Sequence, residues 1–151
     1  MWREKDITKE YAKGDVIIQE GEMGKEMFII QSGSVTVTKE QDGQIVILTT
    51  LERGDFFGEM AILESAPRTA TVKAREETRV VVLNVGSFLI KIRKDPTFAF
   101  IMLQKMSNRI RLLNDRLLKS QTGEDQVDEG IEHGVIRSEY LTQEEVSQET
   151  R

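Results

Sequence analysis

The sequence predicts a mainly β fold, a sandwich or a barrel, that is followed by helices. Between Tyr11 and Leu83, short runs of apolar or alternating residues are separated by turns that contain glycine. From Val85 onward this pattern is replaced by apolar residues at helical spacing. Strands at such regular intervals, with little helix between them, are typical of sandwiches and barrels.

The turn signals place the strands in order along the chain. Gly14-Asp15 precedes VIIQ, and a turn at Gly21 to Gly24 precedes EMFIIQSG, which runs into the alternating SVTVTK. Asp42-Gly43 is a two-residue hairpin signal before QIVILTTL. Two further strands are expected at residues 69–74 and 78–84, so the β structure should end near residue 84.

Helices are expected over residues 85–121. Ser87 is the expected cap of a short helix, FLIKIRK, and Asp95-Pro96 is a typical start for a long one. Apolar residues then recur at alternating spacings of three and four. This stripe could pair two subunits or cover the sheet, and both interpretations stay open. Its members are Leu103, Met106, Ile110, Leu113 and Leu117.

Charge divides the chain into a domain at residues 1–121 and an acidic tail at 122–151. The tail holds nine of the 26 acidic side chains and two of the 21 basic ones, which leaves residues 1–121 near +2. We expect the tail to be flexible or to fold only on a partner. Neither part has the strongly basic surface that binding to a phosphate backbone requires, which argues against nucleic-acid binding.

Composition excludes several other classes of protein. With no cysteine, the chain can have no disulfide, thiolate metal site or cysteine nucleophile. The longest apolar run, Val80 to Leu83, is far too short to span a membrane, and no signal peptide is evident. We therefore expect a soluble, cytoplasmic protein without a membrane partner.

One stretch, GDFFGEMAILESAPRTATV at residues 54–72, has features that a simple core strand does not need. Gly58 can adopt a positive φ before the short helical run EMAIL, whose first amides favour an anion. Arg68 can form paired hydrogen bonds with phosphate oxygens, and Glu59 can accept from a ribose hydroxyl. Each feature alone is ordinary at a helix start or a turn. Their combination favours a phosphate site.

At these residues the chain resembles the cyclic nucleotide-binding domain family. Its phosphate-binding cassette matches FGE and PRTATV here, so we call residues 57–72 the cassette. YAKGDVIIQEG and FIIQSGSVTV match the flanking segments, and the resemblance covers roughly residues 10–120. It implies a jelly roll, or double-stranded β-helix, with a short phosphate-binding helix and a long C-terminal helix. It also implies that the chain binds a cyclic mononucleotide.

The resemblance also implies roles for individual residues. Glu59 would bind the ribose 2′-hydroxyl, and Arg68 would bind the cyclic phosphate. Thr69 would lie beside the phosphate and the base, while Arg109 and Leu113 would cover the base. An arginine and leucine cap favours cAMP over cGMP, because it stacks without offering a guanine-specific pair of acceptors. The remaining assignments are the amides of Gly58, Met60 and Ala61 for the phosphate, and Val35, Thr49 and Val72 for the pocket lining.

The chain departs from the family in two places. Only about ten residues precede Tyr11, so the usual N-terminal helices are nearly absent. The 30 residues after the long helix are too few and too acidic for the DNA-reading motif of catabolite activators, so direct DNA binding is not expected. The expected function is a regulatory sensor whose ligand moves the C-terminal helix and thereby signals to an unknown effector protein.

Two other functions are alternatives to the sensor. A cupin-like enzyme needs several histidines around a metal, whereas the sequence has one, His133 in the tail. A Ser-His or Cys-His pair is likewise excluded from the domain, so we expect neither an enzyme nor a prosthetic group. The main alternative is a protein-interaction module with a degenerate pocket, acting through the long helix or the acidic tail.

Overall fold

The computed structural model describes residues 6–122. The chain forms two compact units, Met1–Ile90 and Lys91–Arg151. Every strand of the described chain belongs to the first unit. The predicted acidic tail, His133 included, lies outside the described residues apart from Thr122.

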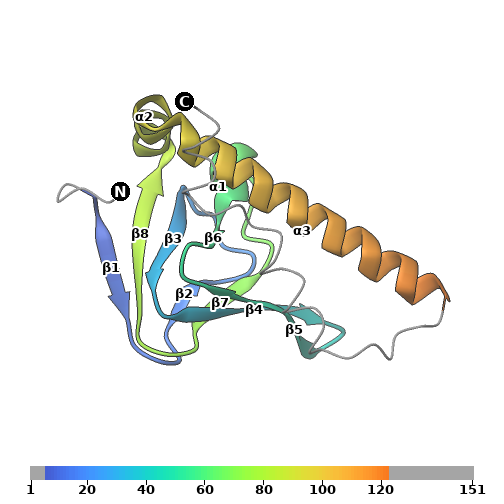
Figure 1. Ribbon diagram of the computed structural model, residues 1–151. Helices are drawn as coiled ribbons and strands as arrows, with labels where there is room; N and C mark the ends of the chain where they lie inside the picture. The colour runs from blue at the N-terminus through green and yellow to red at the C-terminus, as the bar shows by residue number, and fades with distance from the viewer. Residues whose placement is uncertain (1–5, 123–151) are drawn as a thin grey trace. The chain divides into compact units, whose positions relative to one another are not determined.

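Two antiparallel sheets of four strands face each other in the first unit (Figure 1). This confirms the predicted mainly β architecture. One sheet has the order β1 (Thr8–Tyr11), β8 (Thr78–Asn84), β3 (Glu26–Ser32) and β6 (Phe56–Phe57). The other has the order β2 (Val16–Ile18), β7 (Thr71–Ala74), β4 (Ser34–Gln41) and β5 (Gln44–Glu52).

The core lies between the two sheets. Phe28 and Phe57 stack with ring centroids 5.1 Å apart, which joins β3 to β6. The apolar run VVVL of β8 is buried on both faces of the strand. Both sheets contribute to the core, whose buried members are Phe28, Ile30, Val35, Leu51, Phe57, Val72, Val80 and Val82.

Local turn chemistry accounts for the boundary between β4 and β5. Asp42 and Gly43 both have positive φ, 53° and 77°, and Gln41 pairs with Gln44, so the predicted hairpin is confirmed. The strand expected at residues 69–74 begins two residues later, at Thr71. The pattern did not predict β1, because its sequence TKEY is polar and its pairing is with the backbone of β8.

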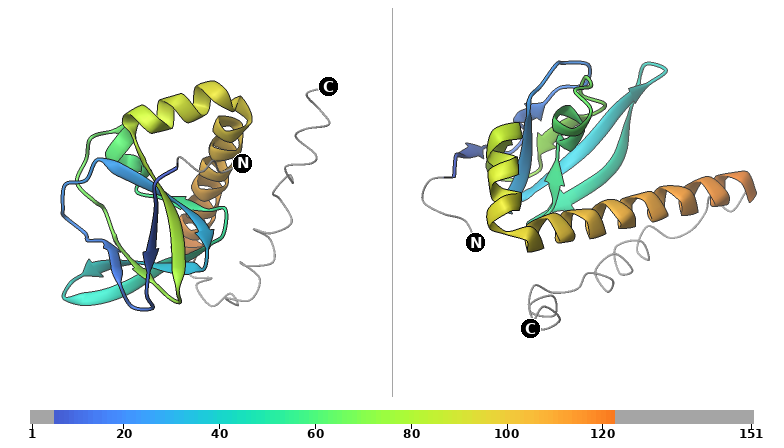
Figure 2. Two further views of the ribbon diagram at one scale, coloured as in Figure 1. Left: turned by 90° about the vertical axis from the view of Figure 1, so that its left-hand side faces the viewer. Right: turned by 90° about the horizontal axis from the view of Figure 1, so that it is seen from above.

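Three helices complete the described chain: α1 (Glu59–Leu63), α2 (Val85–Lys94) and α3 (Pro96–Thr122). The long helix begins at Pro96 as predicted, and the right-hand view of Figure 2 shows it unbroken along its length. The prediction that Ser87 caps a helix at FLIKIRK is wrong. Asn84 Oδ1 accepts a hydrogen bond from the Ser87 amide at 2.9 Å, and Ser87 Oγ accepts one from the Asn84 amide at 2.9 Å. These two reciprocal hydrogen bonds form a capping box with Asn84 as the N-cap, so α2 begins at Val85.

None of the helices in residues 6–122 is long and apolar enough to cross a membrane.

Candidate functional site

Gly58, the second residue of the cassette, separates β6 from α1. Its φ of 78° lies in the left-handed region, which glycine adopts without the steric cost of a Cβ. A Cβ at Gly58 would also lie 2.8 Å from Arg68 Nη1 and 3.2 Å from the Glu26 carbonyl oxygen. Glycine is therefore required here both for the turn and for the close approach of the arginine.

Arg68 is buried against this turn, with 9% of its surface exposed. Nη1 donates to the Gly58 carbonyl at 3.0 Å, and the guanidinium lies over the Phe28 ring, 5.8 Å from its centroid. Two backbone bonds hold its position. The Arg68 amide donates to the Glu22 carbonyl at 2.9 Å, and the Gly21 amide donates to the Arg68 carbonyl at 2.8 Å. The loop after β2 thus fixes the cassette arginine.

Gly24 provides the space that the guanidinium occupies. A Cβ at Gly24 would overlap Nε, Cζ and Nη2 of Arg68. The sequence pattern indicated only a turn at Gly21 to Gly24, so this role was missed. No signal within the segment could have revealed it, because the two residues are 44 positions apart in the chain and meet only through the fold.

The charge of Arg68 is not neutralised by a close carboxylate. Burial lowers the pKa of Arg68 from its usual value, while the more distant carboxylates of Glu26 and Glu59 oppose that shift. An arginine remains protonated at any physiological pH. Within residues 6–122 this side chain forms no ion pair. A buried cation without a paired anion favours the binding of an anionic ligand.

Backbone amides beside Arg68 add to this arrangement. In the described chain, no hydrogen bond engages the amides of Gly58 and Met60. The Ala61 amide donates a long bond of 3.3 Å to the Gly58 carbonyl. Two open amides and a guanidinium meet at the start of α1, and such a set suits an oxyanion. Glu59, the first residue of α1, is half-buried.

The residues predicted to line the pocket differ in exposure. Thr69 is exposed, and its hydroxyl approaches the Met60 sulfur at 3.6 Å. Thr49 is half-buried. Val35 and Val72 belong to the core, with 0% and 1% of their surface exposed. Their role in lining a ligand pocket stays a prediction, because neither presents surface to a bound molecule in this structure.

Arg109 and Leu113 lie on α3, in the second unit, and are four residues apart. Such spacing puts two side chains on the same side of a helix. Leu113 is 57% exposed. That these two residues cover a base stays a prediction.

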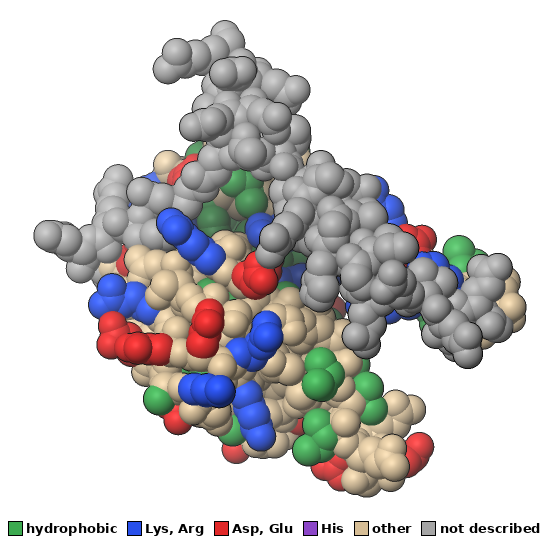
Figure 3. All heavy atoms as spheres, turned by 60° about the horizontal axis from the view of Figure 1, so that its bottom comes forward, with side chains coloured by type: hydrophobic (Ala, Val, Ile, Leu, Met, Phe, Trp, Pro, Cys, Tyr) green, Lys and Arg blue, Asp and Glu red, His purple; other side chains and the backbone are tan. Residues whose placement is uncertain are grey.

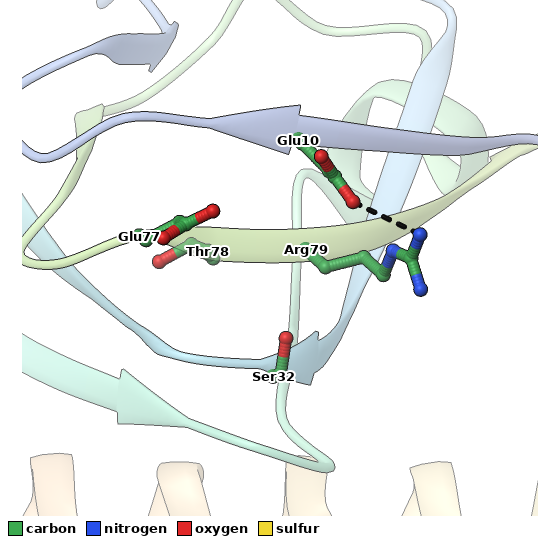
Figure 4. A pocket seen from close by; sticks show the side chains of 5 residues that line it. All are labelled: Glu10, Ser32, Glu77, Thr78 and Arg79. Carbon is green, nitrogen blue, oxygen red and sulfur yellow. Dashed lines mark ion pairs between the residues drawn. The ribbon is translucent and has the colours of Figure 1, made fainter.

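A polar hollow elsewhere in the first unit shares no residue with the cassette. It is lined by Glu10, Ser32, Glu77, Thr78 and Arg79 (Figure 4). Arg79 already pairs with Glu10 at 2.9 Å, and both side chains are at least half exposed. An exposed ion pair contributes little, and the hollow offers no buried cation, so the cassette is the stronger candidate site. The described residues also contain no cluster of metal-ligating side chains.

Comparisons with known proteins identify the family of the chain. Residues 8–95 match the family model described as Cyclic nucleotide-binding domain. The cAMP-dependent protein kinase regulatory subunits of Debaryomyces hansenii and Mycosarcoma maydis are 44% and 42% identical over 81 and 85 residues. These matches cover 54% and 53% of this chain but only 17% and 16% of the relatives, so the chain spans less than a fifth of their length.

Solved structures show the same relationship. The catabolite activator protein of Thermus thermophilus matches with a TM-score of 0.67 and 28% identity, and the match covers 74% of this chain and 53% of the activator chain. The cAMP-bound PfPKA-R matches with a TM-score of 0.58 and 35% identity, and the match covers 72% of this chain and 36% of the PfPKA-R chain. Because the family match runs from β1 through α2 and contains the whole cassette, the chain belongs to the cyclic nucleotide-binding domain family, and its two sheets form that family's jelly roll.

Proposed function

We propose that this chain is a regulatory sensor that binds a cyclic mononucleotide, cAMP in preference to cGMP, at the cassette. The observation that carries the proposal is Arg68, a buried guanidinium without an ion-pair partner among residues 6–122. The open amides of Gly58 and Met60 lie at the same turn and would share the phosphate with it. Similarity to protein kinase regulatory subunits supports cAMP as the ligand.

The remaining contacts follow from the chemistry of the nucleotide. Glu59 would accept a hydrogen bond from the ribose 2′-hydroxyl, a role that suits a carboxylate better than a contact with phosphate does. Thr69 would bond the phosphate or the exocyclic amine of a guanine. Arg109 and Leu113 would cover the base through stacking. The Ala61 amide and the side chains of Val35, Thr49 and Val72 complete the proposed pocket.

Calorimetric titration of the purified chain with cAMP and with cGMP tests this function directly. We expect saturable binding of one molecule per chain and a smaller dissociation constant for cAMP. Binding of neither nucleotide, by calorimetry or by displacement of a fluorescent analogue, would contradict the proposal. A preference for cGMP would leave the sensor intact and assign Thr69 to the guanine amine.

Gly24→Ala is expected to weaken cAMP binding about tenfold without removing any charge. The new Cβ would force the Arg68 guanidinium off its position, and a charge-assisted contact depends on geometry. The free energy of unfolding should change by less than about 1 kcal/mol, because the displaced group is the flexible end of a side chain. Isothermal titration and urea unfolding measure the two effects.

Gly86→Ala is the matched control, since a Cβ there would make only an ordinary contact of 3.4 Å with Asn84. Its affinity should equal that of the unmodified chain. Equal affinities for all three proteins would show that the position of Arg68 does not matter for binding.

We further propose that ligand binding changes the state of α3. Such coupling requires the ligand to bind two conformations with different affinity, and a cap of Arg109 and Leu113 would provide the difference. Amide hydrogen exchange over residues 96–120 should therefore slow in saturating cAMP. Unchanged exchange there, with the cassette amides protected, would separate binding from coupling and refute the latter.

The exposed apolar stripe of α3 favours one alternative, a protein-interaction module. Leu103, Ile110, Leu113 and Leu117 are 57% to 64% exposed, and their spacing suits either an effector or a second copy. The proposed sensor would signal through the other members of this stripe, while Leu113 covers the base. It would catalyse no reaction and bind neither DNA nor a membrane. On the face in Figure 3, basic and acidic side chains are interspersed, which supports a protein partner over nucleic acid. A cytoplasmic location fits this role.

A further inference from the structure

Glu26, the first residue of β3, lies beside the cassette. Side chains alternate along a strand, so Glu26 shares a face with Phe28 and Ile30, both members of the core cluster. Arg68 lies over the ring of Phe28 on this face. The Glu26 carbonyl oxygen is also 3.2 Å from the position that a Cβ on Gly58 would take. The start of β3 therefore borders the proposed phosphate position.

The carboxylate of Glu26 has no hydrogen bond or ion pair with any residue in the described part of the chain, although the side chain is half-buried. Its field nevertheless reaches the surrounding groups. Burial raises the pKa of Tyr11, and the carboxylates of Glu26 and Asp15 raise it further. Glu26 also opposes the effect of burial on the pKa of Arg68. An incoming anion at Arg68 would experience the same negative charge.

Charge at the cassette then depends on three side chains. Arg68 contributes one positive charge, and Glu26 and Glu59 contribute one negative charge each. A cyclic phosphodiester brings one further negative charge. A phosphomonoester such as 5′-AMP brings about 1.5 to 2 at neutral pH, because its second pKa is near 6. Repulsion from a fixed carboxylate grows in proportion to the ligand's charge.

We propose that Glu26 is a specificity-determining residue, whose unpaired carboxylate at the start of β3 excludes doubly charged phosphomonoesters while the singly charged cyclic phosphodiester is tolerated. The inference rests on the proposed function. Glu59 is assigned to the ribose 2′-hydroxyl, which both nucleotides carry. Glu26 has no assigned contact with the nucleotide, and its influence on the pKa of Arg68 is larger than that of Glu59, so we assign the main part of the discrimination by charge to Glu26.

The test compares the affinities of cAMP and 5′-AMP in four proteins at low ionic strength: the unmodified chain, Glu26→Gln, Glu26→Asp and Glu22→Gln. Glu26→Gln keeps the shape and removes the charge, so 5′-AMP should gain about threefold to tenfold more affinity than cAMP. Glu26→Asp keeps the charge and should retain the original ratio. Glu22→Gln removes an equal charge from an exposed loop residue and should also retain it.

An unchanged ratio in Glu26→Gln, or an equal shift in Glu22→Gln, would overturn the inference. A second measurement tests the role of Glu26 separately from the proposed function. The Arg68 Nε–H resonance, identified by its loss in Arg68→Ala, is followed during titration with inorganic phosphate. If the unmodified chain does not bind cAMP, the proposed function fails, yet tighter phosphate binding by Glu26→Gln still supports the role of Glu26. Equal phosphate affinities, or no shift in either protein, would refute it.

Discussion

Arg68→Ala should weaken cAMP binding by roughly 30-fold to 1,000-fold, or about 2 to 4 kcal/mol. Arg68 is the side chain that places a buried positive charge beside the open amides of Gly58 and Met60. Without Arg68, the phosphate would lose a pair of charge-assisted hydrogen bonds. Nothing would then offset the repulsion between the phosphate and the carboxylates of Glu26 and Glu59. Calorimetry or displacement of a fluorescent analogue measures the loss.

Two further variants separate charge from geometry. Arg68→Lys keeps the charge but not the planar fork, so it should recover only part of the affinity. Arg79→Ala removes an equal charge from an exposed residue that is paired with Glu10, and it should bind as the unmodified chain does. Binding by Arg68→Ala within threefold of the unmodified chain would mean that the nucleotide phosphate lies elsewhere.

Local sequence signals were sufficient at two places where the chemistry is local, the hairpin between β4 and β5 and the start of α3. Asp42-Gly43 predicts its hairpin because both residues must take positive φ, and Asp95-Pro96 predicts the start of α3 because proline suits a first helical turn. The pattern around Gly58 and Arg68 likewise predicts a turn and a cation near each other. Their hydrogen bond at 3.0 Å agrees with that expectation.

Contacts between distant segments could not be predicted in the same way. Gly24 accommodates Arg68 only because the loop after β2 folds over the cassette, and Glu26 borders it only through the pairing of β3 with β6. The alternation in SVTVTK predicts a strand but not that Val35 is 0% exposed. Burial depends on the opposite sheet, which a single strand's pattern does not describe.

Gly33→Ala should lower the free energy of unfolding by about 2 to 5 kcal/mol, more than the same replacement at Gly43. Gly33 joins β3 to β4 with a φ of 88°, a conformation that costs an L-residue about 1 to 2 kcal/mol. A Cβ would also lie 2.5 Å from the Glu77 carbonyl oxygen and 2.8 Å from Thr78 Cα. Overpacking against backbone adds about 1 to 3 kcal/mol.

Burial and hydrogen bonds oppose any shift of Thr78 away from such a Cβ. Thr78 is 1% exposed, and its hydroxyl lies within hydrogen-bond distance of the Ser34 and Glu76 carbonyls, at 3.0 and 2.9 Å (Figure 4 shows its side chain). Gly43→Ala is the matched control, because φ is 77° there but no atom lies within 4 Å of the added Cβ. Urea unfolding should show the smaller cost of φ alone for Gly43→Ala. Equal losses for the two variants would mean that Glu77 and Thr78 move aside for the added methyl group. Backbone strain alone would then require glycine at position 33.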